Sequence, residues 1–346
     1  MKKYILIQNN GRENHAGSKA RNDIEEIVIN QNYIPVSIRN YKIDGLLSRI
    51  YQFAVVLVDW IRVLAKIDNY SCLLIQIPVT YGKMYVLLYL RIIKKIRNLN
   101  IIMIIHDLDS IRGKEKFVKR EIDFLRLADQ IICHNDKMKK FLINKTIKPQ
   151  CLISLGIFDY IAKMPNKQIE RRLTNSVIIA GNLSPEKSQY VYKLQQVKGD
   201  IVFNLYGPNY QNQKSFSNIN YHGEFTPEEI IEKLEGSFGL VWDGDDIEKC
   251  SGIMGEYLKV NNPHKTSLYL AAGIPVIVWN QSAMAEFVIR ENIGITVESL
   301  NNISEAIKNM NESEYQVILK NVSSISEKLR KGFYTKAALH KIFMNN

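Results

Sequence analysis

Cysteine is scarce in this sequence, and its spacing argues against two common ways of stabilising a small fold. It occurs four times in 346 residues, at positions 72, 133, 151 and 250. No two of these form a C-x-x-C pair, so neither a zinc site nor a disulfide framework is indicated. We expect reduced, mostly buried thiols of the kind found in cytoplasmic proteins.

The sequence also lacks a long uncharged apolar run. The most apolar stretch, residues 53–67, contains Asp59, Arg62 and Lys66. It is too short and too charged to span a bilayer, and we expect a helix of an α/β layer there. A strand-like segment follows the first three residues directly, which predicts no signal peptide. Short repeats, low-complexity tracts and nucleic-acid-binding signatures are missing as well.

Positive charge is in excess, with a formal net charge of +11 and a pI of about 9.2. Such a balance is compatible with nucleic acid, an anionic membrane surface or a phosphorylated substrate as partner. A Lys-rich composition from an AT-biased genome is the plain alternative. The basic runs at 94–97 and 137–140 are either a membrane-surface patch or ordinary solvated helix faces.

Short apolar strands alternate with helical patterns along the whole chain, which is typical of parallel sheets covered on both faces. Strands are expected at 4–8, 34–38, 73–77, 101–105, 130–133, 177–180, 202–206, 240–242, 275–278 and 295–297. Helices are expected at 19–30, 46–67, 83–97, 115–127, 136–143, 187–195, 227–234, 263–272, 283–290, 303–310 and 312–329.

A polar segment at 163–174 divides this series, and 346 residues suit two domains better than one core. We predict an α/β fold with two doubly wound, Rossmann-like domains that face a cleft. The N-terminal domain covers 1–162 and the C-terminal domain 163–328. Residues 329–346 are expected to form a helix that packs back toward the N-terminal domain.

Residues 239–278 carry the most specific signal. A strand ending in Trp242 runs into Asp243-Gly244, and Asn262-Pro263-His264-Lys265 then opens a short helix. A helix N-terminus presents unpaired backbone N–H groups and the positive end of a dipole. His264 and Lys265 at that end predict a site for a phosphorylated ligand.

Two turns upstream belong to the same expected edge. In the first, Gly181 allows a close backbone approach to a ligand, while Asn182 offers hydrogen bonds. Lys187 lies in the first turn of an expected helix, where a cation is unfavourable unless an anion is near. Tyr206 ends the next strand and is either a stacking platform for uracil or a plain turn aromatic.

In the N-terminal half, a loop at 11–19 follows the first strand, and Gly17 is expected before the helix that follows it. The loop is either a lid over the donor or a mobile segment without function. His106-Asp107 closes the fourth strand. His106 is a candidate for binding the donor sugar and Asp107 for general base, although a lone His at a strand end is more often structural.

Five sequence blocks resemble one known family. They are GSKARNDI, HDLDSIR, AGNLS, LYGP and, most specifically, LVWDG with GEYLKVNNPHKTSLYLAAGIPVIVW. Together they resemble the bacterial glucosyltransferases that add the second sugar to N-acetylglucosaminyl-serine on serine-rich-repeat adhesins, whose relatives are often labelled β-1,6-galactofuranosyltransferases. The resemblance implies a GT-B fold, a UDP-sugar donor, no bound metal and a homo-oligomer, either a dimer or a tetramer.

The resemblance also implies a site, with one departure. Many GT-B enzymes place a phosphate-binding Lys eight residues before a Gly, as Lys265 stands before Gly273. Many also hold the donor ribose with a Glu at the position that is Leu268 here. Asp243 and Asp246 look like a metal motif, but helix dipoles and cations usually replace the metal in this fold.

The expected catalytic residues are His106, Asp107 and Lys265. The expected donor-binding residues are Gly17, Gly181, Asn182, Leu183, Lys187, Tyr206, Asp243, Gly244, Tyr257, Asn262, His264, Lys265 and Ser267. No cofactor, metal ion or nucleic acid is expected.

The resemblance predicts transfer of a hexose, from UDP-glucose, to a sugar acceptor such as N-acetylglucosamine on a Ser or Thr of a surface glycoprotein. One alternative is a galactofuranosyltransferase of a surface polysaccharide pathway. Another is a non-catalytic partner subunit of a glycosyltransferase complex. The expected location is cytoplasmic, with peripheral contact to the inner face of the membrane as an open option.

Overall fold

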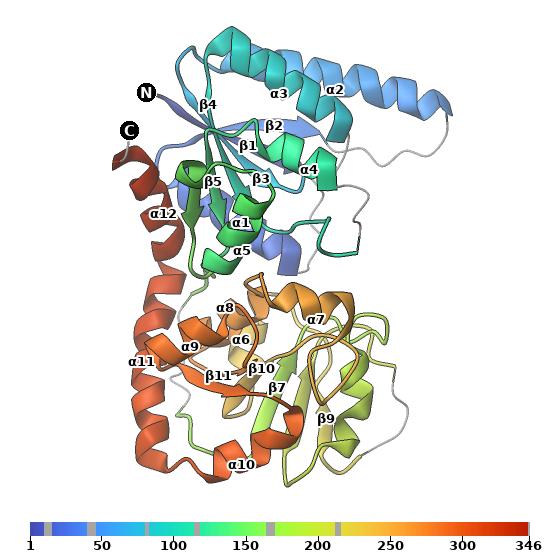
Figure 1. Cartoon of the computed structure of the whole chain (residues 1–346), viewed down its shortest axis with the longest axis vertical. Helices are drawn as coiled ribbons and strands as arrows, with labels where there is room; N and C mark the ends of the chain where they lie inside the picture. The colour runs from blue at the N-terminus through green and yellow to red at the C-terminus, as the bar shows by residue number, and fades with distance from the viewer. Residues whose placement is uncertain are drawn as a thin grey trace.

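The computed structural model describes residues 1–9, 16–39, 46–79, 83–113, 118–163, 170–211 and 216–344. These residues form two parallel sheets of six strands each, one in the upper and one in the lower half of the molecule (Figure 1). The linker residues 164–169 and the loop residues 10–15 lie outside the described part of the chain.

The N-terminal sheet runs in the order β2-β1-β3-β4-β5-β6. Its strands are β1 (Lys3–Asn9), β2 (Ile34–Arg39), β3 (Cys72–Ile77), β4 (Asn100–Ile105), β5 (Gln130–Cys133) and β6 (Leu152–Ser154). Its helices are α1 (Ala16–Ile29), α2 (Leu46–Lys66), α3 (Lys83–Arg97), α4 (Val118–Leu125) and α5 (Asp136–Asn144). Successive strand residues point to opposite faces, so Leu74 and Ile102 join one buried cluster and Ile75 and Met103 the other.

The C-terminal sheet runs in the order β12-β11-β10-β7-β8-β9. Its strands are β7 (Ser176–Ala180), β8 (Val202–Tyr206), β9 (Ile219–Tyr221), β10 (Phe238–Val241), β11 (Val276–Trp279) and β12 (Gly294–Val297). Its helices are α6 (Ile230–Lys233), α7 (Gly252–Leu258), α8 (His264–Ala271), α9 (Ala285–Glu291) and α10 (Ile303–Lys308), with a 3-10 helix at Gln189–Gln196.

In each sheet, strands are first added on one side of the first strand and then on its other side. The chain places β2 on one side of β1 and β3 on the other, and it places β8 on one side of β7 and β10 on the other. Helices on the two sides of such a point leave a crevice outside the carboxyl ends of the strands, where open α/β sheets bind ligands. The fold therefore has one crevice between β1 and β3 and a second between β7 and β10.

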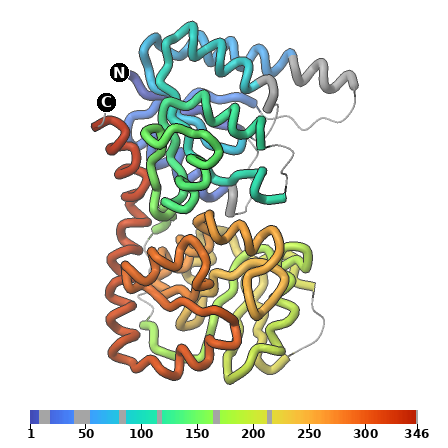
Figure 2. Tube along the Cα trace, viewed as in Figure 1, coloured from blue at the N-terminus to red at the C-terminus, as the bar shows by residue number. Residues whose placement is uncertain are grey.

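Two helices at the end of the chain join the domains. The helix α11 (Glu312–Arg330) packs on α8, and α12 (Phe333–Met344) continues along the same side of the molecule to the N-terminal sheet (Figure 2). Ala338, Leu339 and Ile342 of α12 are buried against the cluster that contains Ile5 and Ile24. The last segment of the chain therefore completes the core of the first domain.

The structure corrects the expected element series in four places. Residues 187–195 do not form an α-helix, because the helical run is 3-10 and begins at Gln189. Two short strands, β6 and β9, were not anticipated, and each lies at the edge of its sheet. The loop expected after Gly244 contains the helix α7.

The cysteines are all free, and three of the four are buried. No helix in the described part of the chain combines the length and the apolar character needed to cross a membrane.

Candidate functional site

The crevice between β7 and β10 has a floor of bare backbone. Gly181, just after β7, has φ +143°, and a Cβ added there would meet nothing within 4 Å. Gly207, just after β8, lies so close that a Cβ on it would come within 1.9 Å of the Gly181 carbonyl oxygen. Glycine is therefore required at 207 for the turns to pack, whereas the space beside Gly181 is open.

Lys265 points to the other wall of this crevice. Its ammonium lies 2.7 Å from Asp243 Oδ1 and donates to the Trp242 carbonyl oxygen at 2.9 Å. Lys265 is the second residue of α8, and the backbone N–H of Ala180 donates to Tyr269 Oη of the same helix at 2.7 Å. Helix α8 thus contacts the end of β10 through Lys265 and the end of β7 through Tyr269.

The carboxyl edge of the N-terminal sheet faces this crevice with aromatic rings. The ring of Phe158 stacks on His106, with centroids 5.4 Å apart, and meets His134 edge-on at 4.9 Å. His264 of α8 lies 6.2 Å from the same ring. Residues after β4 and β5 and the first residue of α8 therefore gather around Phe158, at the junction of the domains.

All three imidazoles are kept neutral by their surroundings. Burial lowers the pKa of His134 to about 4 and that of His264 to about 3. The pKa of His106 is well below its ordinary value, first because of burial and then because of the positive charge of Arg21. A neutral imidazole is a hydrogen-bonding group rather than a cation, so His106 fits contact with sugar hydroxyls better than contact with a diphosphate.

Asp107 connects the two domains through hydrogen bonds. Its carboxylate pairs with Arg112 at 2.8 Å and accepts from Tyr257 Oη of α7 at 3.1 Å. Tyr257 Oη in turn accepts the backbone N–H of Leu108. Burial raises the pKa of Asp107, against the opposing effect of Arg112. A carboxylate with a raised pKa is a stronger base, which suits the role predicted for it.

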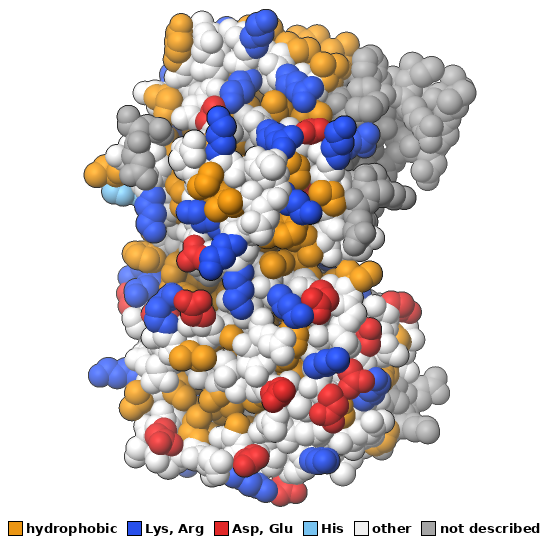
Figure 3. Space-filling model, viewed as in Figure 1, with side chains coloured by type: hydrophobic (Ala, Val, Ile, Leu, Met, Phe, Trp, Pro, Cys, Tyr) orange, Lys and Arg blue, Asp and Glu red, His pale blue; other side chains and the backbone are white. Residues whose placement is uncertain are grey.

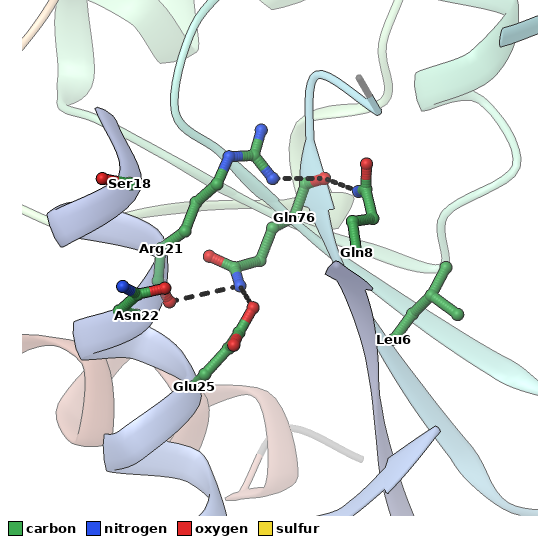
Figure 4. A pocket seen from close by; sticks show the side chains of 7 residues that line it. All are labelled: Leu6, Gln8, Ser18, Arg21, Asn22, Glu25 and Gln76. Carbon is green, nitrogen blue, oxygen red and sulfur yellow. Dashed lines mark hydrogen bonds between the residues drawn. The ribbon is translucent and has the colours of Figure 1, made fainter. Parts of the chain in front are cut away.

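A polar cavity of about 40 Å³ occupies the crevice between β1 and β3 (Figure 4). Gln76 of β3 lies at its centre: Oε1 is 2.6 Å from His106 Nε2, and Nε2 donates to Glu25 Oε1 at 3.1 Å. Burial raises the pKa of Glu25 to about 7. The cavity is lined by Leu6, Gln8, Ser18, Arg21, Asn22, Glu25 and Gln76.

Two predicted donor-binding residues instead hold the domains together. Asn262 donates from Nδ2 to the carbonyl oxygens of His134 and Gly156, at 2.7 and 2.9 Å, and accepts from Asn135. Ser267 Oγ donates to the Phe158 carbonyl oxygen at 2.7 Å. The polar atoms of both side chains are thus occupied by the N-terminal half.

Other predicted residues are placed away from an open ligand surface. Tyr206 is fully buried, and one of its ring faces is covered by His222 at a centroid distance of 4.6 Å, so it is not placed to stack on a base. Leu183 is buried in the core. Lys187 is exposed in a turn, and its ammonium makes no ion pair with the described residues.

The start of α1 also differs from the expectation. The helix begins at Ala16, so Gly17 lies in its first turn and not before it. In the next residues of α1, the Lys19 ammonium is bound to Asp23 and to the Ile161 carbonyl oxygen. Asn182 uses Oδ1 to accept the backbone N–H of Ser184 at 2.9 Å, which stabilises the turn after Gly181.

The two carboxylates considered as a metal motif do not converge. Asp243 pairs with Lys265, whereas Asp246 pairs with Lys193 at 3.0 Å and closes the loop around Gly244. Among the described residues, no group of three or more His, Cys, Asp or Glu side chains is placed to hold a metal ion.

Sequence reasoning missed Glu25, Gln76, His134 and Phe158. A weak signal existed for two of them. Gln76 is the one polar side chain in the apolar run 72–77, and His134 follows its strand as His106 follows the preceding strand. Glu25 and Phe158 carry no such mark, because their roles depend on which segments the topology brings together.

Family models and individual relatives both match this chain over most of its length. The model of the glucosyltransferase 3-like N-terminal domain matches residues 2–157, and that of the C-terminal domain matches 177–342. The β-1,6-galactofuranosyltransferase WbbI of Escherichia coli (strain K12) is 35% identical, covering 98% of each chain. Glucosyltransferase 3 of Streptococcus parasanguinis is 30% identical, and the match covers 71% of this chain and 70% of that relative.

Solved structures share the fold at low identity. Anabaena Alr3699/HepE in complex with UDP-glucose matches with a TM-score of 0.60 at 12% identity, covering 99% of each chain. The lipopolysaccharide outer core galactosyltransferase WaaB in its apo form matches with a TM-score of 0.60 at 13% identity, covering 100% of each chain. The predicted GT-B fold of two Rossmann-like domains is confirmed.

Proposed function

This chain belongs to the glucosyltransferase 3-like family of glycosyltransferases, and from that premise we propose that it transfers glucose from UDP-glucose to an N-acetylglucosamine carried on a Ser or Thr of a surface glycoprotein. The observation that supports a nucleotide-sugar donor is the crevice between β7 and β10. Lys265, the second residue of α8, contacts the residues that end β10, and the space beside Gly181 at the end of β7 is open. Backbone N–H groups, a dipole end and an ammonium together suit a diphosphate.

In the proposed reaction, the acceptor hydroxyl oxygen bonds to the anomeric carbon of the donor while the bond from that carbon to the β-phosphate oxygen breaks. UDP leaves with the bonding electrons. Lys265 and the helix start stabilise its charge, so no metal ion is required. If the configuration inverts, Asp107 takes the hydroxyl proton. A retaining reaction leaves the proton to the departing phosphate and needs no base.

The acceptor side of this proposal rests on the N-terminal crevice. Glu25 and Arg21 bring an acceptor group and a donor group to one small cavity, which is the chemistry that recognises sugar hydroxyls, and Gln76 holds Glu25 in place through a hydrogen bond. Gln76 links that cavity to His106, and His106 lies beside Asp107 at the end of β4.

A second donor is supported by a specific observation. The galactofuranosyltransferase from Escherichia coli matches over nearly the whole chain, whereas the streptococcal match covers 71% of it. The same site would then transfer galactofuranose from its UDP derivative to a surface polysaccharide. The chemistry at the anomeric carbon and the leaving group are unchanged, so only the sugar and acceptor pockets differ between the two proposals.

A transfer assay with the full chain tests both proposals. The protein is incubated in EDTA with UDP-glucose or UDP-galactofuranose, and with an N-acetylglucosaminyl-serine peptide or a polysaccharide acceptor. Glucose on the peptide supports the first proposal, and galactofuranose on the glycan supports the second. Turnover that appears only after Mn²⁺ or Mg²⁺ is added would remove the metal-free claim. A chain that binds UDP but transfers neither sugar would point to the partner-subunit alternative.

The homo-oligomer implied by the family and the cytoplasmic location remain predictions. Light scattering on the purified chain measures the first, and fractionation of cells measures the second.

A further inference from the structure

A row of large apolar side chains lies exposed on α2 and α3. They recur at helical spacing, three on each helix, and each is between 36% and 57% exposed. Residues three or four positions apart share one face of a helix, so each set forms a continuous stripe. We call this surface the α2–α3 face, and it consists of Leu57, Val58, Ile61, Leu88, Ile92 and Ile96.

The two stripes border the same seam. Trp60 of α2 stacks on Tyr89 of α3, with ring centroids 5.7 Å apart. At the end of the seam, the guanidinium of Arg97 donates to the Leu64 carbonyl oxygen at 2.9 Å. Ile61 is one residue beyond Trp60, and Leu88 is one residue before Tyr89, so the stripes flank the contact. The helices lie side by side across the outer part of the N-terminal domain (Figure 1).

The charges around this face are of one sign. Arg91 and Lys95 are exposed beside the apolar stripes, whereas the exposed Arg62 lies 3.4 Å from Asp59 Oδ1. Among the described side chains of α2 and α3, the only carboxylate is Asp59, which is buried and bound to Arg39 at 2.8 Å. Lys94 is not counted among the free cations, because it pairs with Asp129 at 2.8 Å.

The whole domain shares this charge. Residues 1–162 contain 26 Lys and Arg against 15 Asp and Glu, whereas residues 163–346 contain 20 of each. The entire net charge of +11 therefore belongs to the N-terminal half. On the face shown in Figure 3, the upper half carries mainly basic side chains, whereas acidic and basic side chains are mixed over the lower half.

We propose that the α2–α3 face docks on a lipid bilayer with anionic headgroups, with both helices lying in the interfacial plane. Apolar side chains enter the acyl boundary, and the cations beside them meet the headgroups. A second copy of the chain is a poorer occupant, because a two-fold contact would bring Arg91 and Lys95 of both copies onto one interface without a facing carboxylate. The proposal does not depend on the sugar that is transferred.

Vesicle flotation with the full chain tests this proposal. Binding is expected to vesicles of phosphatidylcholine and phosphatidylglycerol in equal parts, and not to phosphatidylcholine alone. It should weaken as salt shortens the screening length. The double variants Ile61→Ser/Ile92→Ser and Arg91→Glu/Lys95→Glu should each lose about tenfold or more in affinity. Turnover on a soluble acceptor should be unchanged in both.

Matched controls come from the C-terminal domain, where Ile289 and Val317 are 64% and 53% exposed. Ile289→Ser/Val317→Ser and Lys249→Glu/Lys320→Glu should bind vesicles like the parent. Equal binding by parent, face variants and controls would overturn the proposal. So would a dimer in light scattering that Ile61→Ser/Ile92→Ser abolishes while no variant binds vesicles. If the serine variant fails to fold by circular dichroism, the charge-reversal variant alone decides.

Discussion

Gln76 is a polar residue in the middle of a buried strand, and each of its polar atoms is used. Its Oε1 meets His106 Nε2, and its Nε2 bonds Glu25 and the Arg21 carbonyl oxygen. In that geometry His106 carries its proton on Nε2, since Gln76 Oε1 only accepts. Gln76 is therefore a positioning residue for His106.

We expect Gln76→Leu to cut turnover by about tenfold or more, as losing a partner that orients a site residue typically does. UDP affinity should stay unchanged, because the C-terminal crevice is not touched. Steady-state kinetics and calorimetry with UDP measure the two effects. The matched control is Asn204→Leu, which removes a buried polar residue of β8 that bonds the Glu235 carbonyl oxygen far from His106. Similar turnover for the two variants would argue against the positioning role.

His134 makes the fold sensitive to acid. Its pKa is about 4 in the folded chain and near 6.5 when unfolded, so between these values only the unfolded state takes up the proton. The contribution of the neutral His134 to the free energy of unfolding is thus present above pH 6.5 and is lost as the pH falls toward 4. From pH 6.5 to 5 the loss is about 2 kcal/mol for this one residue, at roughly 1.4 kcal/mol per pH unit.

His134→Asn should remove this dependence. Asn keeps an acceptor for the Asn262 backbone N–H, which His134 Nδ1 accepts at 2.9 Å. Urea unfolding at pH 7 and pH 5 is the measurement, and the parent should lose more stability than the variant. Parallel losses in the two proteins would mean that His134 does not stay neutral in the fold.

At the residue scale, the sequence singled out candidate positions, and the structure shows which contacts they make. Asp243 follows β10 and pairs with Lys265 of α8, while Gly181 follows the neighbouring parallel strand β7. Asn262 and Ser267 were expected to bind the donor, but they bond the N-terminal half. A polar residue at a helix start serves a ligand or a neighbouring domain equally well, and only the packed structure distinguishes the two.

Elements with a strong hydrophobic pattern could be predicted from the sequence, whereas short elements with a weak pattern could not. The strands β5 and β8 and the helix α3 have the predicted bounds, because the two strands are mostly apolar segments bounded by polar or turn residues and α3 has a clear helical face. The strands β6 and β9 have three residues each, and α7 has seven, so none contains a full pattern. Their formation depends on neighbours that supply hydrogen bonds and apolar cover.

The helix α12 depends on a buried carboxylate at its first turn. Asp159 accepts the backbone N–H groups of Tyr334 and Thr335, at 3.1 and 2.7 Å. We expect Asp159→Ala to lower the free energy of unfolding by about 1–2 kcal/mol, the usual cost of losing a cap, and Asp159→Asn to cost less. Asp200→Ala is the control, since Asp200 is largely exposed and pairs only loosely with Lys308. If urea unfolding gave Asp159→Ala and the control the same free energy of unfolding, a capping role for Asp159 would be excluded.

At the scale of the whole molecule, the two domains meet with their binding edges face to face. His106 and His134 end strands of one sheet, and α8 starts beside the crevice of the other. The contacts of Asn262 and Ser267 fix the junction near Phe158, while Asp107 and Tyr257 join the domains beside the site. This arrangement fits the proposed division of tasks, in which the C-terminal crevice binds the nucleotide and the N-terminal cavity binds the acceptor.

Variants on the two sides should therefore fail in different ways. Lys265→Ala should weaken UDP binding and cut turnover by about 10²-fold, the scale for losing one electrostatic contact to a leaving group. Glu25→Gln should leave UDP binding intact and reduce turnover only. Burial holds the Glu25 pKa at about 7, so the carboxylate is ionised above neutral pH and protonated below it.

If the ionised Glu25 carboxylate accepts a hydrogen bond from the hydroxyl group of the sugar acceptor, turnover of the parent rises as the pH passes 7. This rise is missing in Glu25→Gln. Calorimetry with UDP and turnover between pH 6 and 8 measure both parts of the prediction. Lys249→Ala, an exposed lysine of the loop after β10, is the control for Lys265 and should resemble the parent. A Glu25→Gln variant that loses UDP affinity and turnover equally would place the N-terminal cavity in the nucleotide site, and the division of labour between the domains would be wrong.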